Sequence, residues 1–190
     1  VKDYHEGGKK QNAIIKKYGK IEDWNTSEVT DMSYLFTDSV IREFNKDISK
    51  WNVSKVVNMR GMFYNAESFN QDISGWDVSN VTDMIEMFCR AKSFNQYIGE
   101  WDTSNVTTMA NMFCAAVRFN QPIGDWDTSS VTSLSGMFMS AESFNQPIGE
   151  WNVSKVTNMY RIFWFVESFN PENAPWYDDA KYGDESEYDS

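Results

Sequence analysis

Tryptophan recurs at a fixed interval through most of the chain. Trp24 is followed by five further copies, each 25 residues after the last from Trp51 onward, at Trp51, Trp76, Trp101, Trp126 and Trp151. A Phe-Asn pair keeps the same period from Phe69-Asn70 to Phe169-Asn170. Such a period is typical of small units that stack and bury their apolar faces against one another. We therefore expect an α/β repeat solenoid of six coils over residues 24–170, between an N-terminal cap (1–23) and a C-terminal cap with an acidic tail (171–190).

Each unit predicts a short strand and a helix. Residues 81–91 carry apolar side chains on one stripe of a 3.6-residue period: Val81, Met84, Met87, Phe88 and Ala91. Ser79 precedes this stripe, in the position of a helix N-cap. Residues 94–98 alternate apolar and polar side chains, which indicates a strand, and Gly99 then supplies a turn. An irregular turn in place of the helix is the alternative, because Val and Thr lower helix propensity.

The two ends of the repeat array differ from its middle, as the ends of a stack must. Residues 11–18 predict a short amphipathic cap helix. The last repeat carries Trp164 and Phe165 where other copies have smaller residues. We expect these two rings, with Trp176 and Tyr177, to cover the open end of the stack; an aromatic patch that binds a partner is the rival interpretation.

One asparagine per repeat follows the recurrent Phe. We expect these residues to be buried and to bond backbone groups of their own coil and the next one, as a structural ladder made of Asn70, Asn95, Asn120 and Asn145. A buried amide without a partner costs about 1–3 kcal/mol. This spacing therefore favours a structural role over contact with a ligand.

Positions that vary between repeats are where binding residues are expected, because packing does not dictate them. On the predicted strand these candidates form a polar ridge suited to a protein or a glycan, made of Gln71, Asp72, Gln96, Tyr97, Gln121 and Gln146. The terminal aromatic candidates are Trp164, Phe165 and Trp176. A solvated strand edge is the alternative for the ridge.

The sequence offers little that could do chemistry. The one histidine, His5, lies outside the repeats, so a repeat Ser or Cys has no histidine base. Cys89 and Cys114 with one remote histidine do not form a zinc motif, and we expect two partly buried thiols rather than a disulfide. Phosphate-binding and calcium-binding loops are also missing from the sequence. We therefore expect a protein without enzymatic activity, cofactor or bound metal.

Charge narrows the choice of partners. The formal net charge is −11, and residues 1–20 carry six lysines against two acidic residues. The acidic body argues against nucleic acid and anionic membranes, which need clustered Lys and Arg. The sequence contains no run of 18 apolar residues, so it does not predict a membrane-spanning helix.

The unit FNQDISGWDVSNVTDMIEMF closely resembles the mycoplasma-type 25-residue surface-protein repeat, which is grouped with BspA-like leucine-rich-repeat proteins. The opening KKYGKIEDWNTSEVTDMSYLF is similar to an algal variant of the N-terminal cap. The resemblance implies a leucine-rich-repeat-like solenoid used for adhesion or protein interaction. It also implies a cell-surface or extracellular location, with an organelle lumen as the alternative. A structural accessory subunit that docks through its terminal aromatic residues is the second hypothesis.

Overall fold

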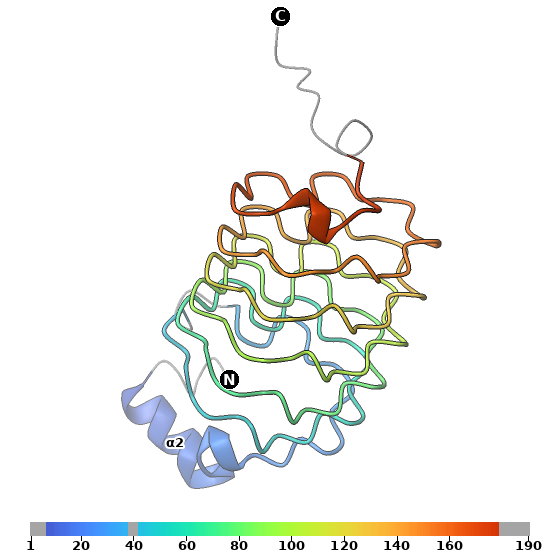
Figure 1. The fold of residues 1–190 in the computed structure, drawn as a ribbon. Helices are drawn as coiled ribbons and strands as arrows, with labels where there is room; N and C mark the ends of the chain where they lie inside the picture. The colour runs from blue at the N-terminus through green and yellow to red at the C-terminus, as the bar shows by residue number, and fades with distance from the viewer. Residues whose placement is uncertain (1–6, 38–41, 179–190) are drawn as a thin grey trace, which may run out of the picture.

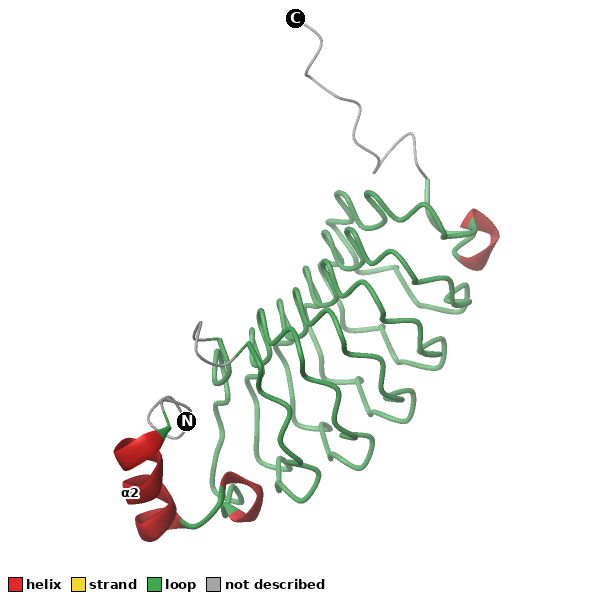
Figure 2. Ribbon diagram, turned by 90° about the vertical axis from the view of Figure 1, so that its left-hand side faces the viewer, coloured by secondary structure: helices red, strands yellow, loops and turns green. Residues whose placement is uncertain are grey.

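The chain winds through a stack of coils in the computed structural model, which describes residues 7–37 and 42–178 (Figure 1). Helix α2 (Gly8–Tyr18) lies at the N-terminal end, followed by the short helix η1 (Ile21–Asp23). Helix η3 (Pro171–Asn173) lies at the other end (Figure 2). The predicted cap helix, residues 11–18, lies within α2. His5 and the acidic residues after 178 lie outside the described residues.

The helix expected within each coil is replaced by a run of turns. Glu86 and Arg90 have φ angles of 58° and 62°, in the left-handed region that a right-handed helix excludes. The backbone N–H of Phe88 donates to the carbonyl of Met112 in the next coil, at 2.9 Å, and not to its own coil. The turns still bury the side chains of the apolar stripe. The pattern of buried residues is therefore the one that a helix would give, although the backbone is not helical.

The expected strand is also absent: the described residues contain isolated parallel bridges and no longer strand. These bridges join one position per coil, along Asp31, Asn58, Asp83, Thr108, Ser133 and Asn158. Within residues 94–98, the N–H of Asn95 donates to a side chain and not to a neighbouring strand. Ser79 is not a helix cap either, because its N–H and hydroxyl donate to Asp77 Oδ1 at 3.1 and 2.6 Å.

Aromatic rings form the core in columns that run along the stack. Phe88 stacks on Phe113 of the next coil with centroids 5.6 Å apart, and Phe94 on Phe119 at 6.0 Å. Within one coil, the Phe88 and Phe94 rings are 4.0 Å apart. Trp101 is buried and donates Nε1–H to the Ile73 carbonyl of the preceding coil at 3.2 Å. Full burial of one such ring contributes about 1.5–3 kcal/mol, so stacking supplies most of the stability.

The C-terminal end of the stack is covered by only part of the expected aromatic set. Trp176 continues the tryptophan column, donating Nε1–H to the Ile148 carbonyl at 2.9 Å. Tyr177 packs edge-on against Phe163 at 5.0 Å. Phe165, in contrast, is 64% exposed and does not cover the end. Trp164 is half-buried against Phe165, with ring centroids 4.1 Å apart.

Candidate functional site

The asparagines expected to form a ladder hydrogen-bond from coil to coil. Each Oδ1 accepts the backbone N–H of the next asparagine at 2.8–2.9 Å, and we call this set the Asn ladder: Asn45, Asn70, Asn95, Asn120 and Asn145. Their side chains are less buried than expected: Asn95 is half-buried and Asn145 is exposed. The ladder therefore runs along an edge of the coils and not through their core.

The candidate glutamines belong to this ladder. Each donates Nε2–H to the same asparagine Oδ1 at 2.9–3.0 Å: Gln71, Gln96, Gln121 and Gln146. All four are half-buried. A side chain engaged in this way contributes to the fold, so the glutamines do not form a free polar ridge.

The two remaining candidates on this edge have local partners. The Asp72 carboxylate accepts hydrogen bonds from the hydroxyl and the N–H of Ser74, which lowers its pKa. Tyr97 is 41% exposed and donates its hydroxyl to Glu100 Oε1 at 2.8 Å, which raises the pKa of the phenol. Neither residue lines a pocket that the structure describes. This edge has the geometry of a solvated surface.

A different edge of the coils combines a constant backbone with changing side chains. We call it the variable face. In each of five coils it consists of the two residue pairs that flank an apolar pair, which is Met-Phe in four coils and Ile162-Phe163 in the last. These flanking pairs are 60–61 and 64–65, 85–86 and 89–90, 110–111 and 114–115, 135–136 and 139–140, and 160–161 and 164–165. Two backbone hydrogen bonds per coil repeat here, for example Glu86 N–H to Ala110 O at 2.9 Å and Arg90 N–H to Cys114 O at 2.7 Å. Because the backbone makes these bonds, the side chains are free to differ.

Large side chains occupy the N-terminal end of the variable face. Tyr34, which is the first coil's equivalent of Gly61, lies across that glycine, where a Cβ would collide with its ring. The Tyr34 hydroxyl donates to Glu86 Oε2 at 3.2 Å and accepts from Arg60 Nε at 3.1 Å. Arg60 also lies 3.9 Å from the carboxylate of Asp83. One exposed tyrosine thus braces three coils.

A second cluster of large side chains lies at the C-terminal end of the same face. The Arg161 guanidinium lies over the Trp164 ring at 4.1 Å and over the Tyr160 ring at 4.8 Å. Tyr160 is 47% exposed, and Phe165 extends the cluster. The coils between the two clusters carry mostly small residues at these positions, such as Ala110, Ala115, Ser135, Gly136 and Ser140.

Sequence reasoning found Trp164 and Phe165 but missed the variable face as a whole. The predicted helix distributed these positions around a cylinder, so they did not form one surface. A signal was available in the positions that require positive φ. Gly61, Gly136 and Asn65 occupy them in some coils, and these residue types tolerate left-handed backbone best.

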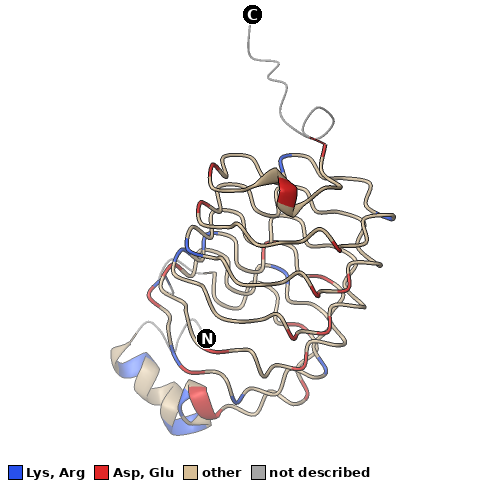
Figure 3. Cartoon of the chain, in the orientation of Figure 1, with Lys and Arg blue, Asp and Glu red and all other residues tan. Residues whose placement is uncertain are grey.

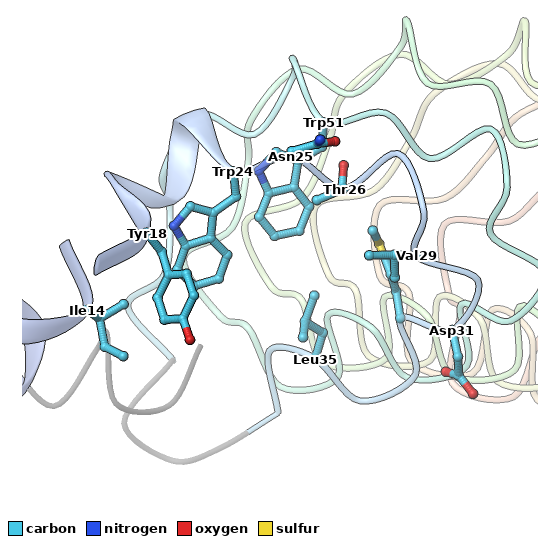
Figure 4. Close-up of a pocket in the computed structure, with 10 residues that line it drawn as sticks. Ile14, Tyr18, Trp24, Asn25, Thr26, Val29, Asp31, Leu35 and Trp51 are labelled. Carbon is cyan, nitrogen blue, oxygen red and sulfur yellow. The ribbon is translucent and has the colours of Figure 1, made fainter. Parts of the chain in front are cut away.

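A pocket of about 600 Å³ lies between α2 and the first coil (Figure 4). Its lining is largely apolar: Ile14 and Tyr18 from α2 face Trp24, Val29 and Leu35 of the first coil. The first coil has no preceding coil, and this leaves its interior partly uncovered. The pocket therefore follows from the end of the stack, and convergent polar groups that would orient a ligand do not line it.

The polar residues that line this pocket, Asn25, Thr26 and Asp31, are already engaged. Asn25 Oδ1 accepts the N–H of Ser27 at 3.0 Å, and the Thr26 hydroxyl donates to Asn52 O at 2.9 Å. Asp31 accepts the N–H of Ser33 at 2.7 Å and a bond from Asn58 at 3.2 Å. Hydrogen bonds from Ser33 lower the pKa of this carboxyl group.

The cap helix is basic, whereas the coils carry both signs of charge. Lysines of α2 lie at the N-terminal end, and acidic residues are spread over the coils (Figure 3). Among residues 7–37 and 42–178, no group of three or more His, Cys, Asp or Glu is placed to hold a metal. No helix in the same ranges has the length and apolar character needed to cross a bilayer.

The family comparison gives one match. A family model described as "Mycoplasma protein of unknown function, DUF285" matches residues 9–116 and again residues 95–184. The two matches together cover the coils and α2, which fits the mycoplasma-type repeat seen in the sequence. No curated protein and no solved structure matches the chain.

Proposed function

Since the chain belongs to the DUF285 family of Mycoplasma-type repeat proteins of unknown function, we propose that it is a non-enzymatic interaction scaffold. In this proposal it binds a partner protein through the variable face. The grouping with BspA-like leucine-rich-repeat solenoids and a cell-surface setting belong to the same proposal. They rest on the recurring FNQxIxxWDxSxVTxMxxMF pattern.

The observation that carries the proposal is where exposed aromatic side chains gather. Tyr160 and Phe165 protrude from the last coil of the variable face, with Trp164 and Arg161 packed beside them. Tyr34 protrudes at the other end of the same face. Large aromatic side chains exposed on one face support the proposal that this face is an interaction surface.

The composition of this cluster favours a protein over a glycan. Trp, Tyr and Arg dominate the binding energy of protein interfaces, and here all three lie together with Phe165. The coils of the variable face are spaced about 4.8 Å apart where their backbones bond, so its five coils extend over roughly 20 Å. That length suits one extended segment or one helix of a partner. Glycan binding is the alternative outcome of the test below.

Phe165→Gly separates binding from folding. Phe165 has a φ of 57°, a conformation that glycine adopts without penalty, so the variant should be at least as stable as the wild type. Removal of an aromatic anchor should weaken partner binding by about 30-fold or more. The measurement is retention of native partners from source extract, together with a glycan array and the melting temperature of each variant.

Tyr97→Ser is the matched control, because Tyr97 is similarly exposed but lies beside the Asn ladder. We expect this variant to retain partners. Loss of retention with Tyr97→Ser and not with Phe165→Gly would move the interface to the ladder edge and overturn the proposal. Retention by both variants would exclude both surfaces.

A second candidate is a structural accessory subunit that docks through the end of the stack. It is favoured by the last coil, where Phe163 and Phe169 are half-buried while their counterparts in inner coils are fully covered. Tyr177 covers only one edge of Phe163. In this case Tyr177→Ser should abolish co-purification with the larger assembly, and Phe165→Gly should leave it intact.

A further inference from the structure

Cys89 and Cys114 occupy the same position on neighbouring coils of the variable face. The residues before and after Cys89 both bond to the next coil: Phe88 N–H to Met112 O at 2.9 Å, and Arg90 N–H to Cys114 O at 2.7 Å. This register places the two cysteines directly opposite each other. Backbones bonded in this way lie about 4.8 Å apart, within the 4.4–6.8 Å Cα separation that a disulfide requires.

The two thiols are chemically unequal. The thiol of Cys89 and, secondarily, the cation of Arg90 lower the pKa of Cys114, because both stabilise its thiolate. The neighbouring Cys114 and burial raise the pKa of Cys89, while the nearby Glu86 carboxylate opposes ionisation of both. Of the two sulfurs, Cys114 is therefore the one that ionises more easily. This division of roles is found in cysteine pairs that react with oxidants.

The surroundings admit a small oxidant and exclude a large one. Both cysteines are free, and their side chains are 5% and 8% exposed. The sequence contains no other cysteine. A molecule the size of hydrogen peroxide reaches an edge-buried sulfur more easily than another protein does, so an intramolecular product is favoured over a cross-linked dimer.

We propose that Cys89 and Cys114 form an oxidative modification site that closes an inter-coil disulfide with a peroxide. The Cys114 thiolate attacks one peroxide oxygen, the O–O bond breaks, and with one proton the products are a Cys114 sulfenic acid and water. The Cys89 sulfur then attacks the sulfenic sulfur and releases a second water as the S–S bond forms. Two thiols lose two electrons in all, and one peroxide is reduced to two waters.

The bond would join the third and fourth coils in the middle of the variable face. The disulfide would tie these two coils together covalently, where backbone hydrogen bonds such as Arg90 N–H to Cys114 O join them on this face at present. The inference does not depend on which partner the variable face binds.

The test treats the reduced full chain, at a concentration where it is monomeric, with hydrogen peroxide. We expect loss of both free thiols, an intact mass lower by two hydrogens, and a linked peptide pair that contains Cys89 and Cys114. Reduction with a dithiol should restore both thiols. A chain that keeps its thiols, or that forms only intermolecular disulfides, would overturn the proposal.

Cys89→Ser and Cys114→Ser assign the roles. Serine keeps a hydroxyl donor at position 89, so in Cys89→Ser the Cys114 thiolate should react with peroxide and be trapped as a sulfenic acid by dimedone. Cys114→Ser should be labelled more slowly, because burial raises the pKa of the remaining Cys89 thiol. Equal labelling rates would contradict the assignment of Cys114 as the attacking thiol. Cys→Ala variants give a second measurement if either serine variant fails to fold.

Discussion

The Asn ladder and the variable face hold the same coils together with different groups. Along the Asn ladder a side-chain oxygen accepts from the next coil, as Asn95 Oδ1 does from Asn120 N–H. Along the variable face a backbone carbonyl accepts, as Ala110 O does from Glu86 N–H. Where the side chain makes the bond, the residue must repeat in every coil. Where the backbone makes it, the residue is free to change, and this is where recognition can develop.

The largest effect is expected in the columns that the coils share. Trp101→Ala removes a buried ring and the bond to Ile73 O, and should cost about 3–5 kcal/mol of unfolding free energy. Trp101→Phe keeps a ring but loses the Nε1–H donor, and should cost about 1–3 kcal/mol. Urea unfolding measures both. An unchanged unfolding free energy in Trp101→Phe would mean that the hydrogen bond contributes nothing, and equal costs in the two variants would mean that burial of the ring contributes nothing.

Asn95→Ala sharpens the comparison between the two edges. It leaves the N–H of Asn120 and the Nε2 of Gln121 without their acceptor, and should cost about 1–3 kcal/mol. Asn65→Gly on the variable face is the matched change. The Asn65 N–H bond to Cys89 O and the positive φ both survive in glycine, so stability should hold within about 0.5 kcal/mol. Urea unfolding measures both variants. Similar losses of unfolding free energy would show that the side chain matters equally on the Asn ladder and on the variable face.

Glycine requirements test how closely the coils approach beside the Asn ladder. A Cβ at Gly99 would lie 2.7 Å from the Pro122 carbonyl oxygen, so Gly99→Ala should cost about 1–3 kcal/mol. Gly75 lies in the same turn of the preceding coil, one position closer to the tryptophan, and a Cβ there meets nothing within 4 Å. Gly75→Ala should therefore change the unfolding free energy by less than about 0.5 kcal/mol. If both variants melt at the same temperature, the close approach at Gly99 is absent in solution.

A smaller effect of opposite sign is expected on the variable face. Ala115 has a φ of 54°, which costs an L-residue about 1–2 kcal/mol relative to glycine. Glycine loses more conformational entropy on folding than alanine does, which offsets part of this relief. The net effect of Ala115→Gly should be a stabilisation of about 0.5–1 kcal/mol. Ala116→Gly, at the next and fully buried position, should destabilise it by a similar amount or more. Thermal unfolding of the two variants side by side checks the sign.

The smallest effect concerns pH. Asp102 accepts the hydroxyl and the N–H of Ser104 at 2.6 and 3.1 Å, and these bonds lower its pKa. The stabilisation is therefore present above the unfolded-state pKa, about 3.9, and is lost as pH falls through the lower folded-state value. Asp102→Asn keeps the oxygen acceptor, as Asn52 does in another coil. Between neutral and acidic pH, the melting temperature should fall less in the variant than in the wild type.

Some features of the fold could be read from the sequence because they depend on which side chains are buried. The spacing of Trp76 and Trp101 equals the length of one coil, and the asparagine after each Phe bonds across coils. The helix could not be excluded in this way. Turns at Glu86 and Arg90 and a helix over the same residues bury the same apolar stripe, so burial pattern does not separate them.

The candidate binding surface was harder to predict for a related reason. The candidate ridge on the predicted strand consists largely of glutamines, and Gln96 and Gln121 recur because they bond to the Asn ladder. The variable face is recognisable only when two left-handed positions per coil are known, since they place residues such as Arg161 and Phe165 on one edge. Variation between coils is the right signal for this face, but it has to be read at the left-handed positions and not on the predicted strand.

Within residues 7–37 and 42–178, each ladder connects a coil to its immediate neighbour, over 24 to 30 residues of sequence. No interaction measures how many coils there are. The number of units is thus unconstrained by the interior, and evolution can lengthen or shorten such a protein by whole units while each junction stays the same. The length of the stack is therefore set by the number of repeats that the gene encodes, and not by any contact that the structure describes.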